Sequence, residues 1–288
     1  MGCRPLALAL CVATSVTLPA LLAIAESPAP EEAPWVAPRG PGGKPDLNGT
    51  WRAMGRANDD LEAHPARAAR AFREGPVGPV PAKEVVALGA VGAVPASLGV
   101  VVGGEIPYRP KAREKKQENQ ENWLDRDPEI KCYLPGIPRA TYMPYAFQIL
   151  HNEDALFFAY EYAGAVRNIH LSDPGPAPID SWMGQSVGSW DGDTLVVVTT
   201  GQNDRTWLDR AGNFHSDQLR VTERFTPTSP HTLEYEATLV DDTVFTRPWT
   251  IRLVLYRLVG DDARLQQFNC VPFVEELLYG HLRKEPLD

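Results

Sequence analysis

The stretch that decides the fold is residues 183–200, MGQSVGSWDGDTLVVVTT. Two runs rich in valine, threonine and small residues flank the dipeptide Asp191-Gly192. An Asp-Gly pair between two such runs is the strongest short-range signal for a two-residue hairpin, because glycine supplies the positive φ that the turn requires. We therefore predict two antiparallel strands, Met183–Trp190 and Thr194–Thr200.

Similar strand-like runs with short connections lie on both sides of this hairpin. They are Ala146–Leu150, Leu156–Tyr162, Val166–Leu171, Gln218–Phe225, Leu233–Val240, Trp249–Leu258 and Arg264–Cys270. Strands that follow one another without alternating helices predict a mainly β, all-antiparallel domain of about nine strands. Both an up-and-down barrel and a sandwich satisfy this pattern.

The chain before these strands has a different texture. Asp59–Glu74 and Lys111–Leu124 are predicted to be short helices, the second with Pro110 at its first position, and a further short helix is predicted at Val274–Leu282. Gly75–Gly104 fits neither the helical nor the strand period, and we predict a loop or flap there. Residues 46–288 are thus predicted to form one β-barrel-like domain with a helical and loop insertion at 55–125.

The first 25 residues have the features of a cleavable signal peptide. Arg4 precedes an apolar run that ends in Ala23-Ile24-Ala25, a small-x-small cleavage site. A transmembrane anchor is the alternative, although such an anchor needs ~20 strongly apolar residues and Pro19 weakens this run. Cys11 leaves a lipoprotein as a further alternative. Residues 26–45 are rich in proline and are predicted to be an extended tether, and the protein is predicted to be periplasmic or secreted.

Charge and motif content exclude several classes of partner and cofactor. The formal net charge is −9 at pH 7, and an acidic chain without a basic stripe repels nucleic acid and anionic membranes. No stable membrane insertion is expected after cleavage. The chain lacks a phosphate loop and a dinucleotide fingerprint, so no cofactor is predicted. The histidines lack ligand spacing, so no metal is predicted, with Asp204, Asp209 and His215 as the alternative ion site.

Two cysteines, Cys132 and Cys270, remain once the signal peptide is removed. An even number of cysteines in an oxidising compartment predicts a disulfide between them. Two independent buried thiols are the alternative.

Two charged residues share a strand face with apolar neighbours. Glu223 is in register with Val221 and Phe225, and Arg167 is in register with Ile169. Alternate residues face opposite sides of a strand, so both charges are predicted to point inward. A lone buried charge is costly, which leaves two interpretations open: a solvated pocket with a carboxylate and a guanidinium, or a structural ion pair inside the barrel.

Two loops carry further candidates. Gly201–Asp217 contains His215, a candidate general base because imidazole titrates near neutral pH; a loop histidine satisfied by hydrogen bonds is the alternative. Pro135–Tyr142 is predicted to be a rigid loop that presents Arg139 and Tyr142. Its alternative is a crossover whose tyrosines pack on the end of the barrel.

These residues define a candidate site. The candidate general base is His215 or Glu223, and the candidate general acid is Tyr142 or Tyr160. The candidate partner for an oxyanion is Arg139 or Arg167. Predicted ligand contacts are Tyr160, Glu161, Trp182, Asn203, Trp207, Asp209 and Trp249.

Three functional hypotheses follow from this site and from export. The first is an exported enzyme that performs cofactor-independent elimination, hydration or isomerisation on a small organic or carbohydrate-derived substrate. The second is a non-catalytic periplasmic carrier of an apolar or amphipathic small ligand. A structural or envelope-associated interaction domain is the third. Oligomeric state does not follow from the sequence.

Several strings resemble a family of exported, uncharacterised bacterial β-rich proteins. They are Asp127–Arg139, Trp182–Ser186, Trp190–Val197 and Phe214–Asp217 with Glu223-Arg224. The resemblance covers most of residues 46–284 and implies export and a single domain, without an activity. In addition, Gly49-Thr50-Trp51 resembles the Gly-x-Trp that opens lipocalin-type chains, which implies a calycin-like barrel.

Overall fold

The computed structural model describes residues 2, 35–66, 72–74, 79–81, 95–122, 126–261 and 263–272. The predicted signal peptide, apart from Gly2, and the predicted helix at Val274–Leu282 lie outside these residues. None of the helices within the described ranges has both the length and the apolar character that crossing a membrane requires.

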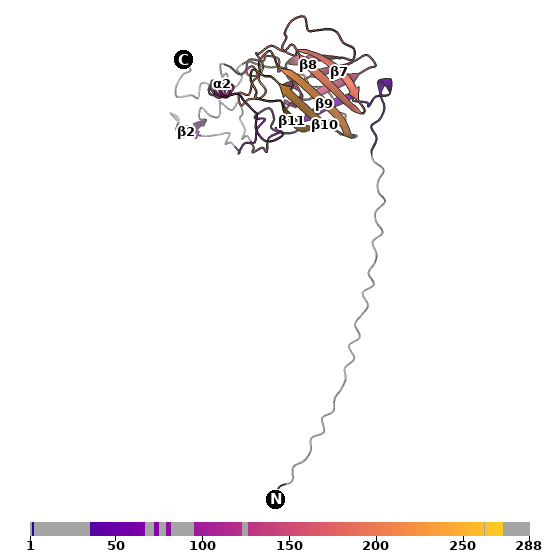
Figure 1. Cartoon of the computed structure of the whole chain (residues 1–288). Helices are drawn as coiled ribbons and strands as arrows, with labels where there is room; N and C mark the ends of the chain where they lie inside the picture. Colours follow the sequence, from indigo (N-terminus) through magenta and orange to yellow (C-terminus); the bar gives the residue numbers. More distant parts are fainter. Residues whose placement is uncertain are drawn as a thin grey trace. The chain divides into compact units, whose positions relative to one another are not determined.

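Within the described residues, nine strands close into a barrel, part of which is labelled in Figure 1. Their order around the ring is β1-β11-β10-β9-β8-β7-β6-β5-β4. The strands are β1 (Gly49–Ala53), β4 (Phe147–His151), β5 (Ala155–Tyr160), β6 (Val166–His170), β7 (Gln185–Asp191), β8 (Thr194–Thr200), β9 (Arg220–Ser229), β10 (Thr232–Val240) and β11 (Trp249–Arg257). The predicted mainly β barrel is therefore confirmed, and the Asp191-Gly192 hairpin lies between β7 and β8 as expected.

One pair of neighbours, β6 and β7, is parallel, so the all-antiparallel prediction is wrong at this point. Strand directions cannot alternate all the way round a closed ring with an odd number of strands, and one neighbouring pair must be parallel. The parallel contact between β6 and β7 is short, because only Ile169 with Ser186 and His170 with Val187 are paired. By comparison, seven residue pairs join β7 to β8. Residues 171–184 supply the long crossover that parallel neighbours require.

The ninth strand is not the one expected. Arg264–Cys270 was predicted to be a strand, but it is extended coil. The ring is closed instead by β1, which contains the Gly-Thr-Trp motif and pairs with both β11 and β4. Because β1 occupies the edge of β11, the segment that follows β11 has no strand edge left to join.

The helix predicted at Asp59–Glu74 is also wrong over its described residues. Residues 59–62 contain the end of a turn and a bend, and His64 forms an isolated β-bridge with Ser97. The Leu61 N–H donates to the Asp209 carboxylate, 2.8 Å away, which holds the backbone in a non-helical path. β2 (Phe72–Glu74) then pairs with β3 (Pro79–Pro81).

The helix predicted after Pro110 is confirmed as α2 (Pro110–Glu121). Among the described residues there are also the short elements α4 (Arg139–Tyr142), η1 (Pro41–Gly43) and η2 (Tyr162–Gly164).

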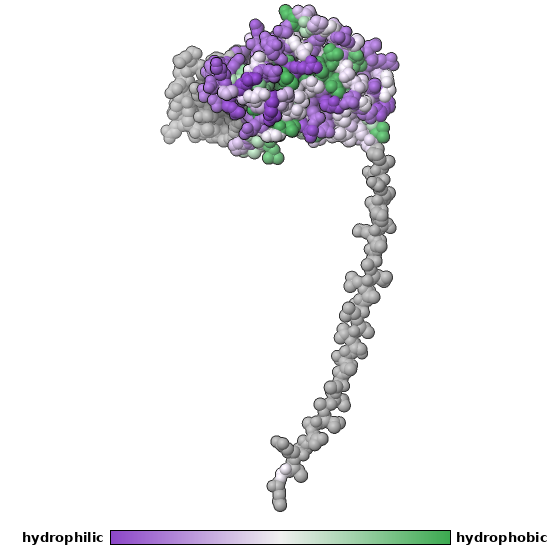
Figure 2. Space-filling view, in the orientation of Figure 1, coloured by the Kyte–Doolittle hydropathy of each residue, from purple (hydrophilic) through white to green (hydrophobic). Residues whose placement is uncertain are grey.

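Buried and exposed residues alternate along the strands, as the alternation of apolar and polar residues in the sequence predicts. Val221, Glu223 and Phe225 of β9 are buried, and so are Arg167 and Ile169 of β6. Large side chains pack inside the barrel, among them Trp51, Phe147, Phe158, Phe225 and Tyr235. The face carrying β7–β11 is mainly hydrophilic in Figure 2, with apolar side chains in small separate groups.

The strand directions gather the long connections at one end of the barrel, which we call the loop end. It collects residues 54–146, 161–165, 201–219 and 241–248. The opposite end carries short turns, the starts of the 171–184 crossover and of the segment after β11, and residues 35–48, part of which was predicted to be an extended tether. That part is docked, since Ala37 is buried and Arg39 makes an ion pair with Asp193.

A disulfide joins Cys132 to Cys270, with Cα atoms 5.7 Å apart and a sequence separation of 138 residues, as predicted. It fixes the segment after β11 to the loop end of the barrel. In the chain-entropy model, closing a loop of this length stabilises the fold by up to roughly 5 kcal/mol.

Candidate functional site

The barrel interior contains an ion pair between Arg167 and Glu223. Arg167 also donates from Nε to Ser186 Oγ, 2.8 Å, and from Nη2 to Thr199 Oγ1, 2.7 Å. Glu223 accepts from the Tyr235 hydroxyl at 2.8 Å. Burial and the Glu223 charge raise the pKa of Tyr235 well above its ordinary value. Both charges predicted to point inward therefore do so and neutralise each other.

Tyr160 also lies in this interior. Its hydroxyl makes no hydrogen bond of normal geometry with a described residue. Burial raises the pKa of Tyr160, and the Arg167 guanidinium partly opposes that effect. This hydroxyl is neutral at physiological pH.

A second charged cluster, which we call the loop-end cluster, consists of Asn58, Asp127, Glu129, Arg139 and Arg210. Arg139 donates from Nη2 to Glu129 Oε2 at 2.5 Å and from Nε to Asn58 Oδ1 at 2.8 Å. Its Nη1 lies 3.7 Å from Asp127 Oδ1. Arg210 makes a bidentate contact with Glu129, 2.8 Å from Nε and 2.6 Å from Nη2. Two carboxylates and two guanidinium groups thus balance at the loop end.

The two carboxyl groups of this cluster have different pKa values. Burial raises the pKa of Asp127 to about 6, against the opposing charge of Arg139. Burial alone would also raise the pKa of Glu129, but Arg210 and Arg139 outweigh it and lower that pKa to about 2. At neutral pH Glu129 is firmly ionised, whereas Asp127 is close to its titration range.

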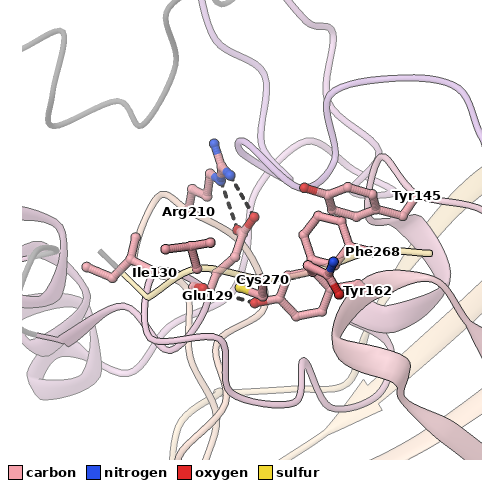
Figure 3. A pocket seen from close by; sticks show the side chains of 9 residues that line it. Glu129, Ile130, Tyr145, Tyr162, Arg210, Phe268 and Cys270 are labelled. Atoms are coloured by element: carbon pink, nitrogen blue, oxygen red, sulfur yellow. Dashed lines mark hydrogen bonds and ion pairs between the residues drawn. The ribbon is translucent and has the colours of Figure 1, made fainter. Parts of the chain in front are cut away.

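A pocket of about 250 Å³ opens beside this cluster. We call it the aromatic pocket; its lining residues are Glu129, Ile130, Tyr145, Tyr162, Arg210, Phe268, Asn269, Cys270 and Val271. Figure 3 shows the Arg210–Glu129 pair on one side and the three rings on the other. Ring centroids are 4.6 Å apart for Tyr145 and Phe268, and 5.4 Å apart for Tyr162 and Phe268. The pocket therefore has an aromatic wall and a charged wall.

Four separate parts of the chain build the aromatic pocket. Glu129 and Ile130 come from the segment between α2 and α4, and Arg210 comes from the β8–β9 loop. The Tyr162 hydroxyl donates to the Glu129 carbonyl at 2.9 Å, which ties η2 to the segment between α2 and α4. Phe268 lies two residues before Cys270, so the disulfide holds this ring against the other walls.

His215 lies apart from the Arg167–Glu223 pair. It is buried, its Nε2 is 2.6 Å from the Thr206 hydroxyl, and its Nδ1 is 2.8 Å from the Ser216 carbonyl. Burial lowers the pKa of His215, so the neutral ring donates from Nδ1 and accepts at Nε2. This geometry corresponds to the alternative of a hydrogen-bonded loop histidine.

Arg139 and Tyr142 are buried rather than presented at the surface. Arg139 is held by the loop-end cluster, and the Tyr142 hydroxyl donates to the Leu208 carbonyl at 2.6 Å. The expectation that Pro135–Tyr142 presents these two side chains is therefore wrong. The segment packs against the Gly201–Asp217 loop because Gln202 binds both the N–H and the carbonyl of Ile137, at 2.6 and 2.9 Å.

Asp209 organises the Gly201–Asp217 loop. Its carboxylate accepts from the backbone of Leu61, Ala211 and Asn213 and from the Asn213 side chain. Burial, together with the charge of Asp60, raises the pKa of Asp209 to about 7. With this many contacts to its own loop, Asp209 has a structural role.

The other predicted ligand contacts are dispersed. Trp207 and Trp249 are buried, and Trp249 packs edge-on against Phe245. Trp182 packs against Tyr133 in a tilted arrangement, with ring centroids 5.0 Å apart. Asn203 accepts from the Arg205 N–H, and Glu161 accepts from the N–H groups of Ala146 and Gln266. None of these residues lines the aromatic pocket.

The loop-end cluster and the aromatic pocket were not predicted from the sequence. The available signal was the Asp127-Pro128-Glu129 string close to Cys132, with Arg139 shortly after it. A pair of acids and an arginine beside a disulfide cysteine marks a fixed, charged loop. Nothing in the sequence indicated that Arg210 would join them.

Neither a search for metal-binding clusters nor a comparison with known proteins assigns a function to this site. In the described parts of the chain, no group of three or more His, Cys, Asp or Glu side chains is placed to hold a metal ion. Comparison of the chain with protein-family models, with curated proteins and with solved structures found no match.

Proposed function

We propose that this protein is an exported, non-catalytic binding protein that holds a small amphipathic ligand in the aromatic pocket. The observation that carries the proposal is the pairing of a three-ring wall with the Arg210–Glu129 ion pair across one pocket. An apolar or flat ligand face packs on the rings, and the polar edge meets the charged wall. At about 250 Å³ the pocket suits a ligand smaller than the usual drug-sized one.

Binding is favoured over acid–base chemistry because the candidate catalytic groups are engaged. Glu223 is paired with Arg167, and both ring nitrogens of His215 have partners. A general base needs a free lone pair within reach of substrate.

Export is supported by the amino-terminal sequence and by the disulfide, which persists in oxidising compartments. Amino-terminal sequencing of the protein purified from the periplasm is expected to start at Glu26. A start at Met1 would contradict cleavage.

Native mass spectrometry of the purified protein tests the binding proposal. We expect a small molecule at near-unit stoichiometry, lost in Val271→Trp, which places a ring in the pocket. Val259→Trp is the matched control: Val271 is 48% exposed and Val259 67%, and Val259 does not line the pocket. An empty wild-type protein, or equal occupancy in both variants, would overturn the proposal.

Enzymatic activity at the loop-end cluster beside this pocket is the second candidate, favoured by one observation. The pKa values of Asp127 and Glu129 are pushed apart, to about 6 and about 2, as in carboxyl pairs that divide acid and base roles. Incubating the extracted ligand with wild type and with Asp127→Asn separates the two candidates. Conversion by wild type but not by the variant supports an enzyme, and an unchanged ligand supports binding alone.

A further inference from the structure

The parallel strands β6 and β7 are paired over only part of their length. Pairing begins at Ile169 and Ser186, so Val166–Asn168 have β5 on one side and no described strand on the other. A pocket of about 400 Å³ opens beside these three residues. We call it the seam pocket; its lining residues are Val166, Arg167, Asn168, His170, Ala177, Pro178, Ile179, Ser181, Met183, Gly184, Gln185 and Ser186.

Hydrogen bonds of the β6–β7 crossover keep the two strands apart at this point. The Ser181 N–H donates to the Gly201 carbonyl, and the Ser181 carbonyl accepts from the Asn203 N–H, both at 2.9 Å. These bonds draw the chain that precedes β7 towards the β8–β9 loop. Gly184, with a φ of 64°, then turns the chain into β7. The gap beside Val166–Asn168 is therefore built into the fold, as is usual for binding sites.

The backbone groups of Val166 and Asn168 point into this gap. In an antiparallel pair, residues that bond to the neighbouring strand alternate with residues whose N–H and C=O groups point to the other side. The Ala165 carbonyl, directly before β6, accepts from the Tyr160 N–H of β5, so the odd-numbered residues of β6 bond to β5. The N–H and C=O of Val166 and the N–H of Asn168 therefore point away from β5. No loop or turn of the described chain supplies a backbone partner for them.

Nothing in the sequence of this strand edge blocks its pairing with another chain. A row of free N–H and C=O groups is a template for a further strand, and proteins usually protect such edges with proline, charged side chains or a covering element. Val166 and Asn168 are uncharged, and Val166 is 53% exposed. The charged side chain between them, Arg167, is buried in the barrel, where it pairs with Glu223. The edge is therefore accessible to an added strand.

Apolar side chains lie beside the open edge. They belong to Val166, Ala177, Pro178, Ile179 and Met183, of which the last four come from the crossover. Ile179 is 76% exposed, whereas Met183 is buried. Alternate side chains of an added strand point to opposite faces, so one set would meet these apolar groups and the other set would face solvent. The lining thus favours a peptide with an apolar residue at every second position.

We propose that the seam pocket binds a short extended segment of a partner protein, which adds to β6 as a strand. Its backbone exchanges hydrogen bonds with Val166 and Asn168, and its apolar side chains pack against Ile179 and Met183. The seam pocket shares no lining residue with the aromatic pocket. The proposal therefore does not depend on the function assigned to that pocket.

Amide hydrogen exchange of the full chain, measured by NMR, tests the open edge and its occupant together. In the free protein the N–H groups of Val166 and Asn168 are expected to exchange rapidly, while those of Arg167 and Ile169, which bond to β5, are protected. The probe is a capped pentapeptide of alternating valine and threonine. At saturation we expect it to slow exchange at Val166 and Asn168 by about tenfold or more. The same peptide N-methylated at every residue cannot pair as a strand, and it is expected to give no protection.

A matched pair of variants locates the binding. Val166→Pro removes one N–H from the edge, and proline is tolerated at the first residue of a strand; Ala165 before it already has the extended backbone that a following proline favours, with φ −62° and ψ 142°. Val166→Thr keeps both the N–H and the β-branched shape. Protection of Asn168 by the peptide is expected to disappear in Val166→Pro and to persist in Val166→Thr.

Three results would overturn the proposal, and two of them need only the wild-type protein. The first is slow exchange at Asn168 in the free protein, which would show that the edge is already paired. The second is no protection by the peptide, or equal protection by its N-methylated form. The third is protection that persists in Val166→Pro, which would place the peptide elsewhere.

Discussion

Glu129 accepts two hydrogen bonds from Arg210 while its Oε2 also receives the Nη2 of Arg139 at 2.5 Å. One carboxylate therefore holds two guanidinium groups that come from segments far apart in the chain. Arg139 is buried, whereas Arg210 reaches the aromatic pocket. Glu129 thus joins the packing of the loop end to the charged wall of the proposed site.

Removing the Glu129 charge is expected to destabilise the protein strongly. In Glu129→Gln the buried Arg139 keeps only Asp127 at 3.7 Å as an acidic partner, and breaking a buried pair typically lowers the free energy of unfolding by roughly 3–5 kcal/mol. Urea unfolding measures the change. The control is Asp193→Asn, which breaks the exposed Arg39–Asp193 pair and is expected to leave the midpoint unchanged. Equal midpoints for the two variants would show that the loop-end cluster contributes nothing.

The pH dependence of stability should carry the signature of Asp127. Its pKa is raised from 3.8 to about 6 in the folded protein, so the folded state binds more protons than the unfolded state between these values. The contribution of Asp127 to the free energy of unfolding is fully present below pH ~4 and is lost as the pH rises towards ~6. At 1.36 kcal/mol per pKa unit, the loss is roughly 2–3 kcal/mol.

Comparing wild type with Asp127→Asn isolates this contribution. Asp209, whose pKa is raised to about 7, acts in the same direction but is present in both proteins. Glu129 acts oppositely, because its pKa is lowered to about 2 and its contribution disappears only as pH falls below ~4.5. Urea unfolding across pH 4–7 should show a shallower decline in the variant, and parallel profiles would contradict the raised Asp127 pKa.

Local patterning in the sequence was enough to predict most of the barrel. Hydrophobic alternation and the Asp191-Gly192 turn located β4 to β11, and face parity placed Arg167 and Glu223 inside. The two strand errors have one cause: β1 and Arg264–Cys270 are both short, and only ring closure decides which of them pairs with β11. Ring closure depends on pairing between residues far apart in the chain, so a short stretch of sequence does not reveal it.

The candidate site was harder to predict because loops from distant positions form it. The topology brings the loops carrying Arg139, Trp207 and His215 to one end of the barrel. There, however, the three side chains are buried, and Arg139 and His215 are held by hydrogen bonds. The Arg210–Glu129 contact joins residues 81 positions apart. A single sequence records the charges of such residues but not their partners.

Reduction of the disulfide is expected to abolish ligand binding before it unfolds the barrel. The Cys132–Cys270 bond fixes Phe268 and Val271 beside Glu129 and Ile130, and neither cysteine lies in a barrel strand. In Cys132→Ala/Cys270→Ala, native mass spectrometry should show an empty protein while far-UV circular dichroism keeps its β signal. Adding reductant to this variant should change nothing. Full occupancy in the reduced wild type would show that the bond is not needed for the pocket.

Gly136 should be far less tolerant of substitution than Gly192, although both have a positive φ, of 71° and 59°. A Cβ at Gly136 would lie 2.7 Å from Thr206 Oγ1 and 3.0 Å from Gln202 Oε1, whereas a Cβ at Gly192 meets nothing within 4 Å. Gly192→Ala is therefore expected to lose about 1–2 kcal/mol from the left-handed backbone alone. Gly136→Ala adds overpacking of roughly 1–3 kcal/mol and displaces Gln202, which holds Ile137. Urea unfolding of both variants measures the difference, and equal losses would mean that the contact between residues 135–142 and the Gly201–Asp217 loop is loose.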